Sequence, residues 1–162
     1  MSSRDSMDIE RLITEERTRC EPEVASKREA LARLSELIGS AAQSLQAGDI
    51  EERLLARERL GSTGLGHGVA LPHARMEQLS QPVGAMIRVD DGIDFGAFDK
   101  APVDLLFALV VPEHFTDEHL QILAALAEMF SDAALCERLR AAEDGSVLYD
   151  RLLEWQANTD PR

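Results

Sequence analysis

Aromatic residues are scarce in this sequence, where they make up 4% of 162 positions. Because 44% of the residues are nevertheless hydrophobic, a core must be packed mainly by Leu, Ala and Val. The same scarcity leaves no ladder of rings on which bases could stack. Positive charge is also in the minority, since seventeen Lys and Arg face thirty Asp and Glu and the formal net charge is −13. Bulk electrostatics therefore argue against binding to nucleic acid or to an anionic membrane, although a local basic pocket could still hold an anion.

Cysteines and long apolar runs are rare as well. Cys20 and Cys136 lie far apart, without CxxC or Cys/His spacing, which favours free thiols over a disulfide or a zinc site. The first twelve residues lack the apolar segment of a secretory signal. The most apolar stretch, residues 101–112, is too short to cross a bilayer and contains Asp104, so it indicates a buried strand. We therefore expect a cytoplasmic protein with no membrane insertion.

The length of the whole chain fits one compact domain. Two helices are predicted in its first third. Ser26 begins a capping box, and apolar residues then recur at helical spacing as far as Gly48. Asp49 begins a second capping pattern, whose helix should stop at Gly61. The turn between these helices would then consist of Gly48 and Asp49 alone.

The rest of the chain alternates strand and helix patterns, which favours an α/β domain. Strands are predicted at residues 69–71, 83–89 and 103–111, the last of them central and buried, with a long turn over residues 90–102. The residues up to about Val24 are expected to supply one more short strand. Helices are predicted from a cap at Thr116 to Phe130, over residues 132–142 and over residues 146–155.

The segment from Gly61 to Gly68, GSTGLGHG, has four glycines in eight residues. We expect it to form neither helix nor strand and to leave several backbone N–H groups free. A strand ended by Pro72 would then deliver His73 at the start of a turn.

His73 has the surroundings that a phosphoryl carrier needs. A neutral imidazole is nucleophilic near pH 7, and the phosphoryl oxygens require hydrogen-bond donors and little competing negative charge. Ser62 and Thr63 offer hydroxyl groups, Arg57 and Arg75 offer positive charge, and residues 61–76 contain no carboxylate. On pattern alone, however, such a histidine is more often a turn residue, and both arginines could be ordinary surface charges.

Two blocks of sequence resemble a known family. ARERLGSTGLGHGVALPHAR (Ala56–Arg75) resembles the signature of the type-2 IIA domain of the bacterial phosphotransferase system, found in fructose, mannitol and nitrogen-regulatory IIA proteins. PVDLLFALVVPEHFTDEHLQIL (Pro102–Leu123) is similar to the family's second block. The similarity predicts a single domain over residues 8–155, with a disordered start at 1–7 and a frayed tail at 156–162.

The resemblance implies a single α/β domain with a mixed central β-sheet flanked by α-helices. It also implies that His73 accepts a phosphoryl group on Nε2 from an HPr-like carrier (NPr or HPr) that Enzyme I phosphorylates. His119 would be the second active-site histidine, hydrogen-bonding the phosphoryl group, and Arg57 would help to hold it. The phosphate-binding loop would comprise Ser62, Thr63, Gly64 and Gly66. No cofactor or metal is expected.

Two positions depart from the family pattern. Ala74 stands where many relatives have Gly, and His67 stands where nitrogen-regulatory proteins tend to have Asn or another residue. Both departures affect the geometry of the loop and the choice of donor rather than a phosphoryl ligand.

The nitrogen-regulatory branch is the favoured subfamily, because this chain has no room for fused IIB, IIC or HPr modules. The resemblance then implies a regulatory component of the phosphotransferase system, rather than an independent turnover enzyme, that contacts targets such as potassium transporters or sensor kinases. Three alternatives stay open: a sugar-specific IIA that passes phosphate to a IIB domain, a non-phosphorylated interaction domain, and a metal hydrolase built on four histidines. The last is disfavoured because no pair of these histidines has HxH or HxxxH spacing.

Overall fold

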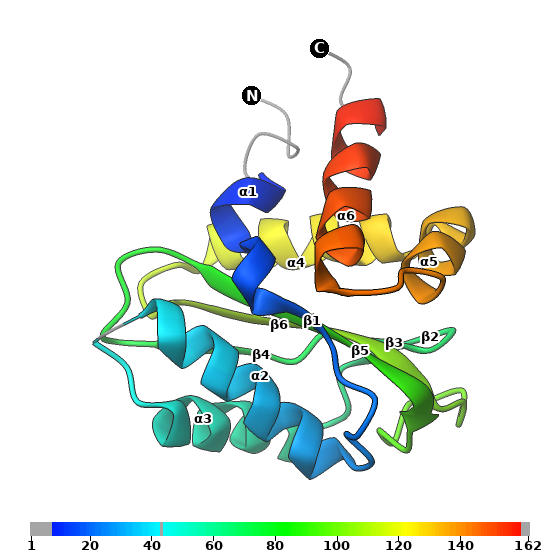
Figure 1. Cartoon of the computed structure of the whole chain (residues 1–162). Helices are drawn as coiled ribbons and strands as arrows, with labels where there is room; N and C mark the ends of the chain where they lie inside the picture. The colour runs from blue at the N-terminus through cyan, green and yellow to red at the C-terminus, as the bar shows by residue number, and fades with distance from the viewer. Residues whose placement is uncertain (1–7, 43, 160–162) are drawn as a thin grey trace.

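A six-stranded sheet forms the middle layer of the fold, which a computed structural model describes for residues 8–42 and 44–159 (Figure 1). The strands are β1 (Thr18–Cys20), β2 (Gly64–Gly66), β3 (Val69–Ala70), β4 (His73–Met76), β5 (Val83–Ile93) and β6 (Val103–Pro112). The helices are α1 (Ile9–Leu12), the 3-10 turn η2 (Glu15–Arg17), α2 (Lys27–Ala41), α3 (Ala47–Arg59), α4 (Asp117–Phe130), α5 (Ala133–Arg140) and α6 (Gly145–Thr159).

The sheet is mixed, as predicted. Its order is β1-β5-β6-β3-β2, and β4 also pairs with β6, on the same side as β3. Strands β5 and β6 are antiparallel, whereas β3 and β4 both run parallel to β6. Strand β4 has no second partner strand among the described residues, so its outer edge is unpaired.

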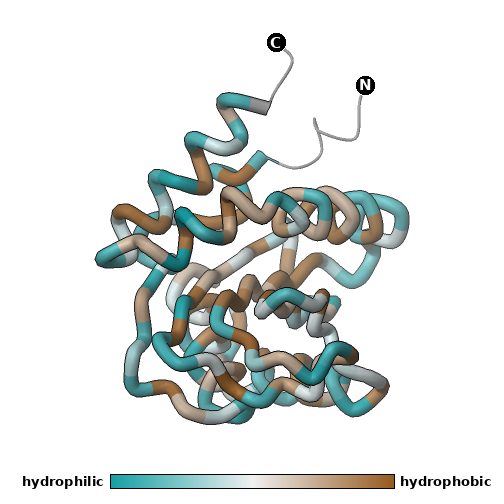
Figure 2. The backbone as a smooth tube through the Cα atoms, turned by 90° about the vertical axis from the view of Figure 1, so that its right-hand side faces the viewer, coloured by the Kyte–Doolittle hydropathy of each residue, from teal (hydrophilic) through white to brown (hydrophobic). Residues whose placement is uncertain are grey.

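Helices cover both faces of the sheet. Helices α2 and α3 lie on one face, and α1, α4, α5 and α6 lie on the other (Figure 1). Along β6, Leu106 and Ala108 belong to the first core and Leu105 and Phe107 to the second, and all four are fully buried. A strand covered on both faces must be largely apolar, which explains the run from Leu105 to Pro112; Asp104, near the start of the strand, is paired with Arg140. Figure 2 shows the hydrophobic segments gathered around this sheet.

Several predicted boundaries are confirmed. The hydroxyl of Ser26 accepts the N–H of Glu29 at 3.1 Å and caps α2. Helix α4 begins directly after Thr116, although the Thr116 side chain makes no capping hydrogen bond. The short strand predicted before Val24 is β1, which pairs with β5 in parallel.

The predicted turn between the first two helices is wrong. Helix α2 ends at Ala41, and α3 begins at Ala47 with Gln46 as its N-cap. Gly48 and Asp49 lie inside the first turn of α3, where the carbonyl of Gln46 accepts the N–H of Asp49 at 3.0 Å. The capping pattern at Asp49 misled the prediction because an acidic residue is favourable both at the N-cap and in the first turn.

The glycine-rich segment and its neighbourhood also differ from expectation. Gly64–Gly66 forms β2 and pairs with β3, and His73 opens β4 instead of a turn. Proline has no N–H to donate, but its carbonyl can still accept a hydrogen bond. The Pro72 carbonyl accepts the N–H of Leu109 at 2.9 Å, and this bond to β6 lets the sheet continue after Pro72.

Two further boundaries lie beyond their predicted positions. Strand β5 continues to Ile93, into the predicted turn, and α6 continues to Thr159, into the predicted frayed tail. The predicted disordered start at 1–7 and the last three residues lie outside the described residues. Within the described part of the chain, no helix combines the length and the apolar character needed to cross a membrane.

Two glycine substitutions should have opposite effects on stability. At Gly48 an added Cβ would meet nothing within 4 Å, and the position is helical, so Gly48→Ala should stabilise the fold by about 0.5 kcal/mol. At Gly84 a Cβ would lie 2.9 Å from the Phe107 ring, so Gly84→Ala should destabilise by about 1–3 kcal/mol. Urea unfolding of both variants measures these changes, and a destabilised Gly48→Ala would contradict the start of α3.

Candidate functional site

An open hollow of about 590 Å³ lies beside the free edge of β4. Residues of α3, β4 and α4 line it together, so it is built where helices from both faces of the sheet reach one strand. His73, His119 and Arg57, which are far apart in the sequence, all contribute to its wall. The fold therefore brings together the three side chains that the sequence singles out.

The ring of His73 is held by the backbone two residues before it. Its Nδ1 lies 2.9 Å from the carbonyl oxygen of Leu71. A carbonyl can only accept a hydrogen bond, so Nδ1 must carry the proton. In the neutral ring this leaves the free lone pair on Nε2.

The environment of His73 favours the neutral ring. Burial lowers its pKa below the ordinary value of 6.5, and the charge of Arg57 lowers it further. The hydrogen bond to Leu71 and the carboxylate of Glu58 act in the opposite direction, and the net shift of the pKa is downward. His73 therefore keeps its free lone pair at neutral pH.

His119 stands edge-on to His73. The two ring centroids are 5.4 Å apart, and the ring planes make an angle of 81°. His119 is 9% exposed, and its buried Nε2 makes no hydrogen bond to any described residue. Burial, with the charges of His73 and Arg75, lowers the pKa of His119 to about 4. A neutral second imidazole thus lies within reach of a group attached to the first.

Three arginines surround the hollow. Arg53 and Arg57 are four residues apart on α3, and Arg75 follows His73 by two residues on β4. Helical spacing of four and strand spacing of two each place side chains on one face. Arg75 is exposed and also lines the hollow, so it is both of the things that the sequence left open for it: a surface charge and a positive charge near His73. The guanidinium of Arg57 also donates through Nη1 to the carbonyl of Gly61, at 2.9 Å.

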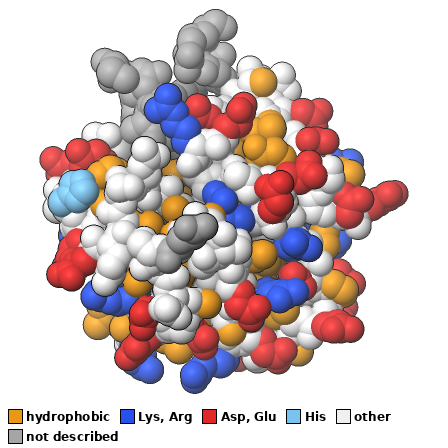
Figure 3. Space-filling model, turned by 60° about the vertical axis from the view of Figure 1, so that its left-hand side comes forward, with side chains coloured by type: hydrophobic (Ala, Val, Ile, Leu, Met, Phe, Trp, Pro, Cys, Tyr) orange, Lys and Arg blue, Asp and Glu red, His pale blue; other side chains and the backbone are white. Residues whose placement is uncertain are grey.

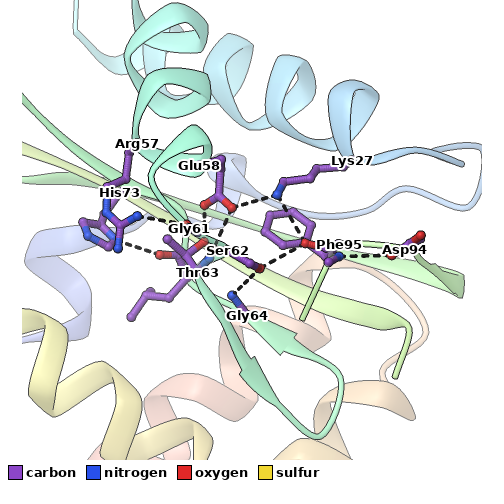
Figure 4. A network of polar contacts seen from close by, with 12 residues as sticks. Lys27, Arg57, Glu58, Gly61, Ser62, Thr63, Gly64, His73, Asp94 and Phe95 are labelled. Atoms are coloured by element: carbon purple, nitrogen blue, oxygen red, sulfur yellow. Dashed lines mark hydrogen bonds and ion pairs between the residues drawn. The ribbon is translucent and has the colours of Figure 1, made fainter. Parts of the chain in front are cut away.

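The polar groups of the glycine-rich segment are already engaged. The hydroxyl of Ser62 donates to the Phe95 carbonyl at 3.0 Å and accepts the N–H of Gly64 at 3.1 Å (Figure 4). Thr63 is buried, and its N–H and hydroxyl both donate to Glu58. In this structure the two hydroxyls hold the loop and do not point free donors at His73.

Three of the four expected loop residues line a hollow together with His73, and the fourth does not. Ser62, Thr63 and Gly64 share a second hollow of about 340 Å³ with His73. Gly66 lines neither of the two hollows, and a Cβ there would lie 3.1 Å from the ring of Phe98.

The hollow is not free of carboxylates, although residues 61–76 contain none. The fold brings Glu58 from α3 behind Thr63, and Glu113 lines the main hollow. Sequence reasoning missed both because they lie outside the glycine-rich segment. Glu58 is bonded to Thr63 of the glycine-rich segment, and its negative charge is paired with Lys27 at 2.9 Å.

The two other histidines are exposed and lie apart from this pair. His67 occupies a left-handed turn, with φ of 56°, where its N–H donates to Asp99 at 2.9 Å. The ring of His114 packs edge-on against Phe115. No three His, Cys, Asp or Glu side chains in the described ranges are grouped so that they could hold a metal ion. On the face in Figure 3, acidic and basic side chains are interspersed without a continuous basic surface.

Acid should destabilise the fold through His119. Its pKa is lowered on folding, so between pH 6.5 and about 4 the unfolded chain binds more protons and stability falls as pH falls. Urea unfolding at about pH 7 and pH 4.5 should show a loss that is smaller in His119→Gln by about 2 kcal/mol. His114→Gln, which removes an exposed imidazole, is the control and should follow the wild type. Equal losses in wild type and His119→Gln would contradict the burial of a neutral ring.

Comparisons with known proteins identify the family of this chain. The family model described as "Phosphoenolpyruvate-dependent sugar phosphotransferase system, EIIA 2" matches residues 11–155. A nitrogen regulatory protein of Pseudomonas aeruginosa is 39% identical, over 91% of this chain and 96% of its own length. A fructose-specific EIIA component of Haloferax volcanii is 35% identical, over 93% of this chain and 97% of its own. The crystal structure of nitrogen regulatory protein IIA-Ntr from Neisseria meningitidis has a TM-score of 0.76 at 36% identity, covering 92% of this chain and 97% of that one. The chain therefore belongs to the EIIA type-2 family of the phosphoenolpyruvate-dependent sugar phosphotransferase system.

Proposed function

We propose that this phosphotransferase-system carrier accepts a phosphoryl group on Nε2 of His73, from an HPr-like donor (NPr or HPr) in the cytoplasm, and regulates other proteins by direct contact. The observation that carries the proposal is the hydrogen bond from Nδ1 of His73 to the Leu71 carbonyl. That bond fixes the proton on one nitrogen and leaves the other as a nucleophile in a hollow lined by arginines.

The transfer needs no proton to leave His73. Nε2 attacks phosphorus, the N–P bond of the donor's phosphohistidine breaks, and its electron pair stays on the donor ring. The acceptor ring gains positive charge as the Nε2–P bond forms. Its Nδ1 proton keeps its bond to the Leu71 carbonyl, which stabilises that charge.

Arg57 and His119 have complementary roles in this proposal. Arg57 lines the hollow and can neutralise part of the phosphoryl charge, exchanging its bond to Gly61 for a bond to a phosphoryl oxygen. His119 is neutral at pH 7 because its pKa is about 4. A neutral ring can donate one hydrogen bond to the phosphoryl group while leaving the surrounding charge unchanged.

Phosphorylation would change a surface that suits protein contact. Leu60 and Leu120 line the hollow and are 84% and 67% exposed. A phosphoryl group adds about two negative charges between these apolar side chains and can switch a partner on or off. The similarity to nitrogen regulatory proteins of Pseudomonas aeruginosa and Neisseria meningitidis supports a regulatory output. Potassium transporters and sensor kinases are the classes of target that we propose.

A sugar-specific relay is the second candidate. The relative from Haloferax volcanii is a fructose-specific EIIA component and matches this chain over nearly its whole length. The two functions differ in what happens to the phosphoryl group: in sugar transfer it passes on to a IIB domain, and in regulation it stays on the carrier while the carrier contacts its targets. Rapid passage of the phosphoryl group from His73 to a fructose-type IIB domain would favour sugar transfer, and its absence would favour regulation.

Replacing His73 should abolish phosphorylation. Incubation with phosphoenolpyruvate, Enzyme I and an HPr-type carrier should add the mass of one phosphoryl group to the wild type and none to His73→Gln, because the Nε2 of His119, the other histidine that lines the hollow, is buried. His114→Gln, which alters an exposed ring elsewhere, is the matched control and should gain the mass. A wild type that gains nothing would favour the interaction-domain alternative.

His119→Gln should slow transfer without unfolding the protein. The variant loses a donor placed beside the reacting ring, and we expect a rate lower by roughly 10²-fold. Rapid-quench kinetics measure the rate, and a thermal melt at neutral pH checks the fold. An unchanged rate in a folded variant would reject the role of His119.

A further inference from the structure

We propose that Glu58 is a positioning residue for the transfer: through Thr63 and Leu71 it holds the His73 ring with Nε2 free. The inference rests on the proposed role of His73 and adds to it a residue that does not touch the phosphoryl group.

An unbroken series of hydrogen bonds joins Glu58 to the reactive ring. The Glu58 carboxylate accepts the N–H of Thr63 at 3.2 Å and also the Thr63 hydroxyl. The Thr63 carbonyl accepts the N–H of Leu71 at 3.0 Å. The Leu71 carbonyl in turn accepts Nδ1–H of His73 at 2.9 Å. Figure 4 shows Glu58 above Thr63 and His73 to the left of both.

The carboxylate at the start of this series is buried and fully paired. The Glu58 side chain is 4% exposed, and the ammonium of Lys27 lies 2.9 Å from it. Lys27 is itself held, because it donates to the Phe95 carbonyl at 3.2 Å and lies 4.3 Å from the centre of the Phe95 ring. The Glu58 carboxylate that binds Thr63 is therefore held in place by Lys27 of α2, which Phe95, after β5, holds in turn.

Stability alone is a poor explanation for such a pair. Desolvating two charges offsets much of their attraction, and an apolar pair could join α2 to α3 at least as well. What an apolar pair could not do is accept the N–H and the hydroxyl of Thr63 together. The geometry points to the fixing of Thr63, and through it of Leu71, as the reason for a charge at this place.

The tautomer of His73 depends on the position of the Leu71 carbonyl. In a neutral imidazole either nitrogen can carry the proton, and its hydrogen-bond partner selects which. If Thr63 and Leu71 shift, the proton is no longer held on Nδ1, and molecules with the proton on Nε2 have lost the nucleophile. Loss of the Glu58 charge by itself would change the proton affinity of the ring but would leave this selection intact.

Glu58→Gln and Thr63→Val test the proposal with two readouts. Nitrogen-15 NMR of the unphosphorylated protein reports which ring nitrogen of His73 is protonated, and quench kinetics report the transfer rate. We expect both variants to shift the His73 proton toward Nε2 and to lower the rate by about tenfold. Thr63→Ser keeps the hydroxyl and should recover the wild-type tautomer and rate.

The matched control is Glu51→Gln. The Arg28–Glu51 ion pair, at 3.2 Å, also joins α2 to α3 but has no bond to the glycine-rich segment. This variant should keep the wild-type tautomer and rate, so that loss of a helix-to-helix ion pair is separated from loss of the bond to Thr63.

Unchanged tautomer and rate in a folded Glu58→Gln and in Thr63→Val would overturn the inference and leave the role of His73 standing. If Glu58→Gln does not fold, Thr63→Val decides, because it keeps the ion pair and removes one hydroxyl. If the wild type accepts no phosphoryl group, the proposed function fails. The NMR measurement, which needs no donor, then decides alone whether Glu58 holds the ring.

Discussion

The hydrogen bond between Nδ1 of His73 and the Leu71 carbonyl is the constraint on which the chemistry of the site depends. It exists because the sheet is interrupted between β3 and β4, at Leu71 and Pro72, and both strands pair with β6. Backbone hydrogen bonds hold both residues of the interruption. The N–H of Leu71 donates to the Thr63 carbonyl, and the Pro72 carbonyl accepts the N–H of Leu109. A ring held by so rigid a backbone needs no reorganisation before it reacts, which is the condition for efficient transfer.

The site also solves a problem of charge. On the proposed function, a chain with a net charge of −13 must receive a dianion, and positive side chains gather beside the proposed acceptor. Arg53, Arg57 and Arg75 line the hollow around His73, and the carboxylate behind the loop is neutralised by Lys27. The pKa of His119 is lowered to about 4, chiefly through burial, so this second ring adds no positive charge that would bind a phosphoryl group too tightly to pass it on. The result is a site that suits a transient rather than a permanent phosphoryl group.

The fold class, the central strand and the pair of histidines that the fold places side by side could be predicted from apolar periodicity and from two recognisable blocks. The sequence did not contain the pairing partners. Strand β4 is four residues long and begins at a residue after proline, so only its register with β6 makes His73 part of a sheet. The free hydroxyls expected at Ser62 and Thr63 are occupied because Phe95 and Glu58 come from other elements. Contacts between distant segments decide which donors remain free, and no local pattern encodes them.

The central claim is that phosphorus binds to Nε2 of His73, and the direct measurement is NMR of the phosphorylated protein with nitrogen-15 histidine. Coupling between phosphorus-31 and nitrogen identifies the bonded atom. The hydrogen bond to Leu71 requires coupling to Nε2 of His73, with the proton still on Nδ1. Coupling to Nδ1, or to a nitrogen of any other histidine, would contradict the account.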